Sequence, residues 1–282
     1  MWKLQTAWEF EMQNVLERIV EQTTSDLSKR KKKVSFNDLH SLEGFEKERI
    51  DFKKALQGEQ VSIIAEVKKA SPSKGIIRED FNPLDIALRY QDGGASAISV
   101  LTDKPFFKGD LEYLSEISKR VQLPLLRKDF IIDPFQIKEA RAYGADAVLI
   151  IVAITDGSQL HELVAAAKEF GLSALVECYD QEDFDRIDFS EVDILGVNNR
   201  DLKYFKVDVH RGISILKQAP QGTVLVSESG ISTGEDIALL QREGIHSALI
   251  GEHFMRQPDP GKAVSELLEQ GEEEFERSLQ NG

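Results

Sequence analysis

Cysteine is almost absent from this chain, which has a single one, Cys178, among 282 residues. A lone cysteine excludes an internal disulfide and fits a reducing compartment, so we expect a cytoplasmic protein. Also missing is any apolar run of about 18 residues, the length that a transmembrane helix needs. The N-terminal stretch MWKLQTAWEFEMQ carries acidic residues and has no signal-peptide core. We therefore expect no membrane partner.

Positive charge is also in short supply, with 35 basic residues against 49 acidic ones and a formal net charge of −14. This balance argues against a nucleic-acid-binding surface, and no nucleic-acid partner is expected. The basic run Lys29–Lys33 is the local exception. We interpret it as a solvated segment between helices, with a targeting or nucleic-acid role as the alternative.

What the chain does have is a regular alternation of strand-like and helix-length segments at a repeat of roughly 25 residues. Glycines at Gly94, Gly144 and Gly244 each follow a helical segment and lead into a strand, where glycine can end a helix in the left-handed conformation. The pattern predicts a closed (β/α)8 TIM barrel. An open doubly wound sheet is the alternative, weakened because neither a GxGxxG nor a Walker A motif is present. The expected strands are near 62–67, 97–101, 125–128, 147–152, 174–177, 194–198, 224–227 and 248–250.

Three regions are expected along the chain. Residues 1–60 read as an N-terminal helical extension packed on the barrel, beginning with an apolar stripe from Leu4 to Val20 at helical spacing. We expect the stretch Phe45–Leu56 of this extension to lie near the substrate-binding end. Residues 61–270 form the barrel, and 271–282 form an acidic C-terminal tail, either a helix extension or a frayed end.

The stretch Ile63–Gly75, IIAEVKKASPSKG, places Glu66 and Lys68 at the end of a buried strand, two residues apart and hence on one side of it. Active sites of such barrels lie at the carboxyl ends of the strands. Ionisable or polar groups also follow the third, fifth, sixth, seventh and eighth strands, at Lys128, Glu177, Asn198 and Arg200, Glu228 and Ser229, and Glu252. Odd-numbered strands share layers of the barrel, so Glu66, Lys128, Glu177 and Glu228 are predicted to converge. Cys178 should alternate away from them and pack.

Glycines follow the last two strands, in Ser229-Gly230 and Gly251-Glu252. Loops at these places commonly present backbone N–H groups to a phosphate, and glycine allows close approach. Plain turns are the alternative. The Glu252 carboxylate is a poor neighbour for phosphate, so it must point away or serve through its N–H alone.

Seven segments in order, IAEVKKASPSKG, SVLTDKPFFKGDLEYL, LRKDFIIDPFQIKEARAYGADAVLIIVA, ALVEC, GVNNRDL, SESGI and ALIGEHFMR, resemble the indole-3-glycerol phosphate synthase family of tryptophan biosynthesis. The resemblance runs from about Leu16 to Ala263. It implies a (β/α)8 barrel with an extra N-terminal helical segment. The first dozen residues and the tail after Leu268 match nothing in the family.

The resemblance implies an activity: ring closure of 1-(2-carboxyphenylamino)-1-deoxyribulose 5-phosphate to indole-3-glycerol phosphate, with loss of CO2 and water and without a metal or organic cofactor. By matched position, Lys128 is the general acid and Glu177 the general base, with Glu66, Lys68 and Asn198 as further catalytic groups. Ser71, Phe107, Arg200, Glu228 and Ser229 are implied to contact the substrate, and Gly230, Gly251 and Glu252 to hold its phosphate.

The chemistry of the substrate suits these residue types. It carries a carboxylate and a phosphate, so a net acidic protein needs a locally basic binding site. That basic character comes from Lys68, Lys69, Lys74, Lys128 and Arg200. The rival interpretations are another phosphosugar barrel of the tryptophan pathway, a non-catalytic phosphosugar sensor and a structural scaffold. We expect a small-molecule phosphosugar substrate and a monomer or weak homo-oligomer.

Overall fold

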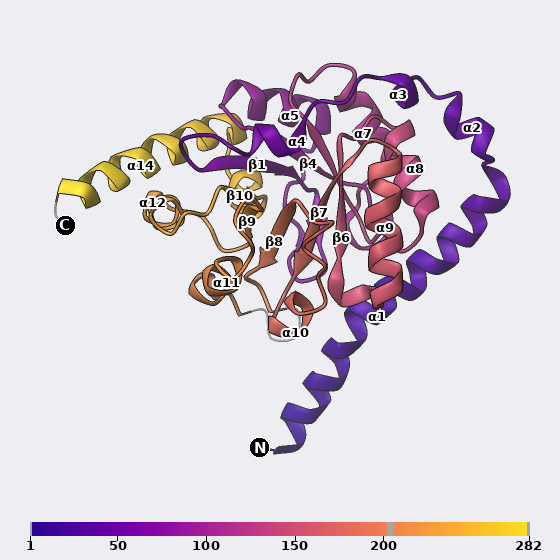
Figure 1. Ribbon diagram of the computed structural model, residues 1–282, viewed down its shortest axis with the longest axis horizontal. Helices are drawn as coiled ribbons and strands as arrows, with labels where there is room; N and C mark the ends of the chain where they lie inside the picture. The colour runs from indigo at the N-terminus through magenta and orange to yellow at the C-terminus, as the bar shows by residue number, and fades with distance from the viewer. Residues whose placement is uncertain (1, 202–205, 281–282) are drawn as a thin grey trace.

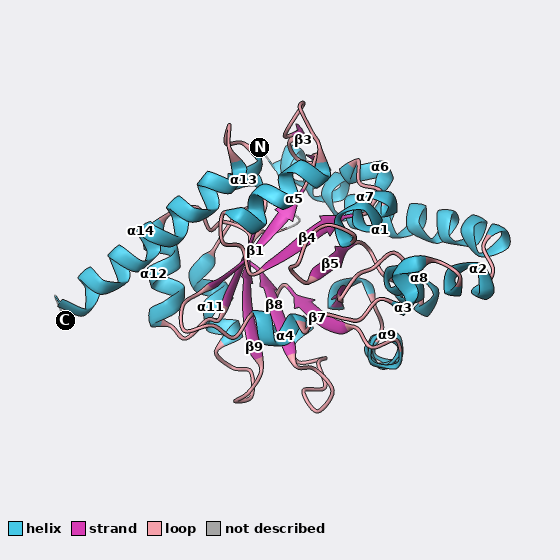
Figure 2. Cartoon of the chain, turned by 90° about the horizontal axis from the view of Figure 1, so that it is seen from above, coloured by secondary structure: helices cyan, strands magenta, loops and turns pink. Residues whose placement is uncertain are grey.

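The computed structural model describes residues 2–201 and 206–280, with side chains from Val15 onward. Within these residues, eight parallel strands close a barrel in the order β1-β10-β9-β8-β7-β6-β5-β4 (Figures 1 and 2). The (β/α)8 prediction is confirmed, and the open sheet is excluded because β1 pairs with both β4 and β10. The strands are β1 Ser62–Val67, β4 Ala97–Leu101, β5 Leu125–Lys128, β6 Ala147–Ile151, β7 Ser173–Cys178, β8 Ile194–Asn198, β9 Val224–Glu228 and β10 Ser247–Ile250.

Helices alternate with the strands and surround the barrel (Figure 2). Most begin directly after a residue whose side chain accepts a hydrogen bond from the first turn, such as Asn82 before α5 or Asp208 before α11. These helices are α5 Pro83–Asp92, α7 Leu111–Ser118, α8 Pro134–Ala142, α9 Gly157–Glu169, α10 Gln181–Phe184, α11 Val209–Leu216, α12 Gly234–Arg242 and α14 Pro260–Gln280. Shorter elements follow some strands: the hairpin β2 Ala70–Ser71 and β3 Gly75–Ile76, α6 Lys104–Phe107, η1 Val152–Ile154 and α13 Glu252–Met255.

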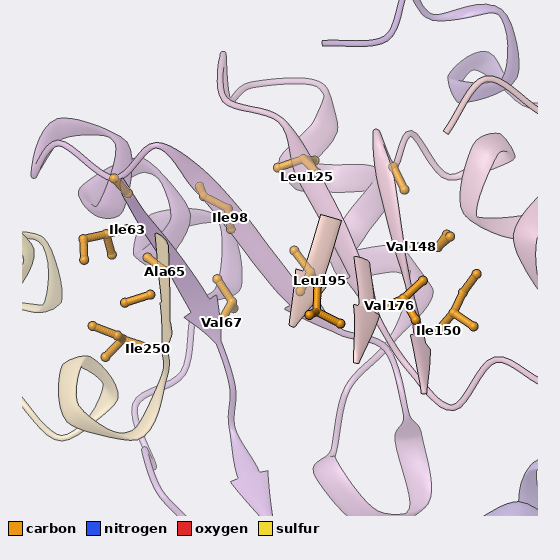
Figure 3. Packing of buried hydrophobic residues seen from close by; sticks show 14 of the residues in the cluster. Ile63, Ala65, Val67, Ile98, Leu125, Val148, Ile150, Val176, Leu195 and Ile250 are labelled. Carbon is orange, nitrogen blue, oxygen red and sulfur yellow. The ribbon is translucent and has the colours of Figure 1, made fainter. Parts of the chain in front are cut away.

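The apolar side chains form two layers because successive residues of a strand face opposite sides. Outward-facing residues such as Ile63, Val148 and Val176 pack beneath the helices (Figure 3). Inward-facing residues such as Ile64, Leu126 and Leu175 fill the barrel. Cys178 belongs to the outer layer, as predicted, and burial raises the pKa of its thiol.

The N-terminal segment forms α1 Trp2–Lys33, α2 Phe36–His40, α3 Glu43–Glu46 and α4 Phe52–Ala55. The basic run Lys29–Lys33 lies in the last turns of α1 rather than between helices, which corrects that expectation. Basic side chains suit a helix C-terminus because of the helix dipole. The side chains of Leu4, Trp8 and Met12 lie outside the described residues.

The stretch Phe45–Leu56 lies at the opposite end of the barrel from the site, so its predicted place was wrong. Phe52 and Leu56 are fully buried and join the inner core. The Ser247 hydroxyl at the start of β10 donates to the Leu56 carbonyl, and Asp146, before β6, accepts from the Ile50 N–H. The sequence showed an apolar segment in need of burial, but it did not show which end of the barrel that segment covers.

The C-terminal helix α14 packs on α12 and α5 and continues without a break through residue 270 to Gln280 (Figure 1). Close packing depends on glycine, since a Cβ on Gly261 would lie 2.3 Å from the Arg89 carbonyl oxygen of α5. Among the described residues, no helix has both the length and the apolar composition needed to cross a bilayer.

Candidate active site

A cavity of about 1320 Å³ opens at the carboxyl ends of the strands. Both polar groups at the strand ends and apolar side chains line it. Part of the wall comes from α1, through Val15, Leu16, Ile19 and Val20. The extension therefore reaches the site through its first helix. Each predicted site residue lines the cavity: Glu66, Lys68, Ser71, Phe107, Lys128, Glu177, Asn198, Arg200, Glu228, Ser229, Gly230, Gly251 and Glu252.

The centre of the site is Lys128, whose Nζ lies 3.3 Å from Glu177 Oε2 and 3.2 Å from Glu228 Oε2. Glu66 and Lys68 form a second ion pair at the end of β1. Strand alternation explains the convergence, because Leu126 and Lys128 share the inward face of β5, and Leu175 and Glu177 that of β7. The structure thus brings together the four groups whose convergence the sequence predicted.

Electrostatics keeps Lys128 charged. Burial lowers the pKa of its ammonium, but Glu228, Glu177 and Glu66 together raise it well above the ordinary lysine value. Burial also raises the pKa of Glu66, yet the ammonium groups of Lys68 and Lys128 bring it below its usual value. Lys128 is therefore a protonated acid at neutral pH, held among carboxylates.

The pKa of Glu228 is raised, in contrast to that of Glu66. Burial raises its pKa, Lys128 lowers it, and the neighbouring Glu177 raises it again, so that the net shift is upward. Three carboxylates face two ammonium groups in this cluster, so an extra proton balances the charge. The Glu228 side chain has room because Gly196 of β8 lies beside it, where a Cβ would be 2.4 Å from Glu228 Oε1. The cluster therefore holds one proton that is more easily released than that of Lys128.

An aromatic pair forms one wall. The ring centroids of Phe107 and Phe130 are 5.9 Å apart. Phe107 lies in the short helix α6, which the Asp103 carboxylate caps by accepting from the N–H groups of Phe106 and Phe107. Burial raises the pKa of Asp103 to about 6. The two rings are tilted by 38° to each other and, with Leu101, Leu149 and Ile154, give this part of the cavity an apolar lining suited to an aromatic ring.

Asn198 and Arg200 lie on the other side, at the end of β8. The Asn198 side-chain oxygen accepts from the Arg200 N–H, and its carbonyl accepts from Arg211 of α11. The Arg200 guanidinium lies 3.7 Å from Glu252 Oε2, and Glu252 also pairs with Arg256 at 2.9 Å. The Glu252 carboxylate is thus engaged by two guanidinium groups, which leaves its N–H as its available contact with an anion.

The turns after β9 and β10 are constrained. Ser229 has a φ of 70° and Gly230 has a φ of 83°, so both residues adopt the left-handed conformation and only the second is a glycine. A Cβ at Gly230 would lie 2.2 Å from Val207 Cγ1. A Cβ at Gly251 would lie 2.2 Å from Glu66 Oε2 and 3.0 Å from Lys68 Nζ. A side chain at Gly251 would therefore have to displace the Glu66–Lys68 pair, a constraint that the sequence did not reveal.

Other residues of the site were also missed. Phe130 follows Lys128 by two positions, so strand alternation alone placed it on the same side. The apolar stripe of α1 signalled burial, but its target was not deducible from spacing. Arg127 and Asp129, which flank Lys128, are buried partners of each other, 3.0 Å apart, and their spacing alone did not indicate this pairing.

A sequence profile described as indole-3-glycerol phosphate synthase matches residues 16–267. The chain belongs to the indole-3-glycerol phosphate synthase family. A relative of that name from Salinibacter ruber is 48% identical over 260 residues, which cover 92% of this chain and 96% of the relative. Another from Campylobacter jejuni is 47% identical over 258 residues, 90% of this chain and 100% of the relative.

Solved structures outside the indole-3-glycerol phosphate synthase family share the fold alone. The 3-hexulose-6-phosphate synthase of Salmonella typhimurium is 18% identical, with a TM-score of 0.58 over 74% of this chain and 99% of that one. A chain from the tryptophan synthase complex of Pyrococcus furiosus is 14% identical, with a TM-score of 0.53 over 77% of this chain and 98% of that one.

Proposed function

We propose that this chain converts 1-(2-carboxyphenylamino)-1-deoxyribulose 5-phosphate to indole-3-glycerol phosphate, a decarboxylating ring closure in tryptophan biosynthesis. Family membership supports this activity. The observation that carries the proposal is the partly buried ammonium of Lys128, which lies among Glu66, Glu177 and Glu228, whose charges raise its pKa, beside an aromatic wall. A protonated acid next to an aromatic-ring site is what closure of an aryl ring onto a ketone requires.

In the first step, the ring carbon that bears the carboxylate attacks the sugar ketone. Lys128 gives its proton to the ketone oxygen as the carbon–carbon bond forms. The bond to the carboxylate then breaks, CO2 leaves, and the electron pair restores the aromatic ring. Phe107 and Phe130 support the anthranilate ring against the apolar wall. The product of this step is a closed ring that still bears a hydroxyl group.

In the second step, the hydroxyl leaves as water while the amine nitrogen loses its proton. A proton then moves from the ring CH2 beside the nitrogen to the nitrogen, which forms the indole double bond and restores the N–H. Glu177 takes the amine proton, and the leaving hydroxyl receives one from the acidic cluster. Glu228 contributes to that cluster because its raised pKa lets it hold a proton next to Lys128. The two steps together consume one proton and release CO2 and water.

We assign the two anionic groups of the substrate to different residues of the site. We assign the substrate carboxylate to Lys68, with Ser71 and Asn198 contributing hydrogen bonds. We assign the phosphate to Arg200, Ser229 and the N–H groups of Gly230, Gly251 and Glu252. A test is backbone NMR of the protein titrated with inorganic phosphate. The amide resonances of Gly230, Gly251 and Glu252 should shift, and shifts confined to other amides would reject this assignment.

We further propose three regions along the chain: the extension 1–60, whose Phe52 and Leu56 join the barrel core, the barrel 61–270, and the tail 271–282, which continues helix α14 as far as Gln280. The chain would act in the cytoplasm as a monomer or weak homo-oligomer, without a cofactor or nucleic-acid partner. The single cysteine and the net charge of −14 support this setting. Sedimentation at several protein concentrations measures the association state.

The decisive experiment for the function is turnover of the purified protein with the proposed substrate, followed by the fluorescence of the indole product. A rise in indole emission with release of CO2 is expected. Demonstrated binding with a flat fluorescence trace would instead favour a non-catalytic sensor of phosphosugars.

A further inference from the structure

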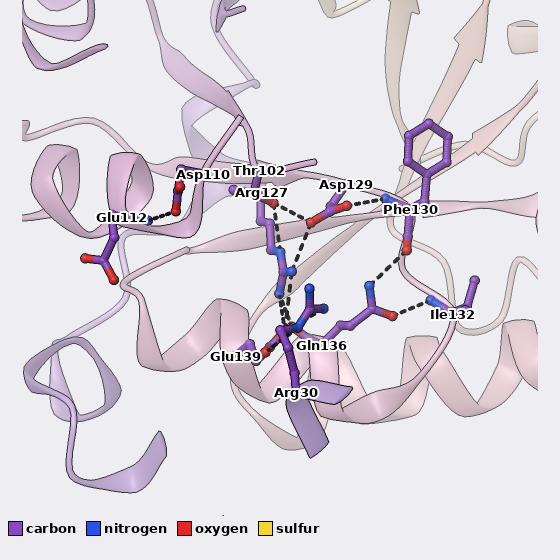
Figure 4. Close-up of polar contacts among 10 residues, drawn as sticks. All are labelled: Arg30, Thr102, Asp110, Glu112, Arg127, Asp129, Phe130, Ile132, Gln136 and Glu139. Carbon is purple, nitrogen blue, oxygen red and sulfur yellow. Dashed lines mark hydrogen bonds and ion pairs between the residues drawn. The ribbon is translucent and has the colours of Figure 1, made fainter. Parts of the chain in front are cut away.

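The outward face of β5 carries a buried polar cluster directly behind Lys128. Arg127 is fully buried between β5 and α8 (Figure 4). Its Nη2 lies 3.0 Å from Asp129 Oδ2, its Nε donates to Thr102 at 3.1 Å, and its Nη1 donates to the Gln136 carbonyl at 2.5 Å. The Arg127 guanidinium is therefore fixed from three sides.

The same cluster holds the chain that follows Lys128. Asp129 Oδ1 accepts from the Phe130 N–H at 2.8 Å. The Gln136 side chain donates to the Phe130 carbonyl at 2.9 Å and accepts from the Ile132 N–H at 2.9 Å. Both neighbours of Lys128 in the chain are thereby anchored on the outside of the barrel, while Lys128 points inward.

Glu139 of α8 links this cluster to α1. One of its oxygens lies 3.4 Å from Arg127 Nη1, and the other lies 3.1 Å from Arg30 Nε of α1. The side chain of Glu139 is 3% exposed, whereas that of Arg30 is 36% exposed. A charged path therefore runs from the surface of α1 through α8 to the strand that carries Lys128. The same helix α1 supplies part of the cavity wall.

Stability alone is a weak reason for such a cluster. Desolvation of buried charges offsets much of their attraction, and apolar residues of similar volume often serve stability equally well. The cluster instead orients β5, because its several charge-assisted hydrogen bonds fix the angle and register of this short strand. That strand bears the proposed acid of the reaction.

We propose that Arg127, Asp129 and Glu139 are positioning residues that hold Lys128 in its place among Glu177 and Glu228, and that Arg30 couples the docking of α1 to this arrangement. The inference rests on the proposed function for its catalytic consequence. Its structural content, the placement of the Lys128 ammonium, can be measured without turnover.

The chain offers a matched pair of variants on α8. Glu139→Gln and Asp133→Asn each replace a carboxylate by its amide, and each breaks an ion pair to α1, with Arg30 or with Lys31. Only Glu139 touches Arg127. Asparagine at 133 still caps α8, where Asp133 accepts from the Phe135 N–H. Each variant therefore removes one ion pair between α1 and the region of α8, the more exposed pair in Asp133→Asn, and only Glu139→Gln also changes the cluster behind Lys128.

Two readouts are compared between these variants. In steady-state kinetics, Glu139→Gln should lower kcat by about 10- to 100-fold, as expected for a misplaced catalytic group. Asp133→Asn should keep kcat within about twofold, as surface changes do, and KM should change similarly in both. In NMR spectra of 15N-lysine protein, the Lys128 Nζ resonance, assigned with Lys128→Met, should shift and exchange faster with water in Glu139→Gln alone.

Equal kcat values for the two folded variants, or a Lys128 Nζ resonance unchanged by Glu139→Gln, would overturn the proposal. If Glu139→Gln does not fold, Arg30→Gln at the exposed end of the path replaces it, with Lys31→Gln as its control. A wild-type protein that turns over no substrate would refute the proposed function, while the Nζ comparison would still decide the positioning role.

Discussion

Replacing Glu228 by glutamine tests whether the site holds the extra proton that its charge balance requires. Glutamine has nearly the same shape. Its oxygen can accept from Lys128 as Glu228 Oε2 does, and its amide can donate to Glu177 as a protonated carboxyl would. The variant therefore resembles Glu228 in its protonated form at every pH.

The expected effect on stability follows from the rise of the Glu228 pKa from 4.5 to about 8. Between these values the unfolded chain has released the proton that the folded protein still holds. Stability contributed by this group is therefore complete below the unfolded value and is lost as the pH rises through the folded value. A tenfold change in proton affinity corresponds to about 1.4 kcal/mol, and coupling to Lys128 reduces the total, so we expect a loss on the order of a few kcal/mol.

Glutamine does not release a proton, so it escapes this loss. Urea unfolding between pH 5 and pH 9 should show the free energy of unfolding of Glu228→Gln rising relative to wild type as the pH increases. Glu162→Gln, an exposed change on α9, is the control and should show a constant difference. A constant or falling difference for Glu228→Gln would refute the shared-proton description of the site.

Three further changes address other parts of the site. Lys128→Ala should lower turnover by about 10²–10⁴, the range for loss of a positioned acid, and near-normal kcat would contradict its role. Gly251→Ala should reduce kcat equally with phosphorylated and dephosphorylated substrate, because the new methyl group would displace the Glu66–Lys68 pair. A loss of kcat with the phosphorylated substrate alone would show instead that the methyl group mainly crowds the phosphate. Removing residues 1–33 should raise KM about tenfold, roughly 1.4 kcal/mol, while the barrel stays folded. Removing residues 1–60 should also unfold the barrel, because Phe52 and Leu56 are lost from the core. Equal melting temperatures for the two truncations would contradict this difference between residues 1–33 and residues 34–60.

Much of the site was predictable because barrel geometry translates sequence position into space. Strand ends meet at one face, and a period of two decides which side chains point inward, so Lys128 and Glu177 could be placed together from their positions alone. Phe130 follows the same alternation, so its place in the site could have been predicted in the same way. The fold followed from the regular repeat of strands and helices.

The parts that sequence could not supply depend on contacts between distant segments. The apolar residues Phe52 and Leu56 had to be buried, but either end of the barrel would have satisfied that need. Likewise, nothing local to Gly251 shows that Glu66 occupies the space where its side chain would be. The Arg30–Glu139 pair joins residues 109 positions apart, and helical periodicity gives no information about such a partner.

The division of labour between Lys128 and Glu177 is tested most directly by a single turnover of Glu177→Gln, stopped with acid and analysed by mass. Glutamine keeps the shape of the side chain and an oxygen beside Lys128, but it removes one of the carboxylates that raise the Lys128 pKa and cannot accept the amine proton. The ring should close and CO2 should leave, so that a species which has lost CO2 but retained water accumulates. A variant that stalls with unreacted substrate alone would contradict the account, because Glu177 would then be needed before the carbon–carbon bond forms.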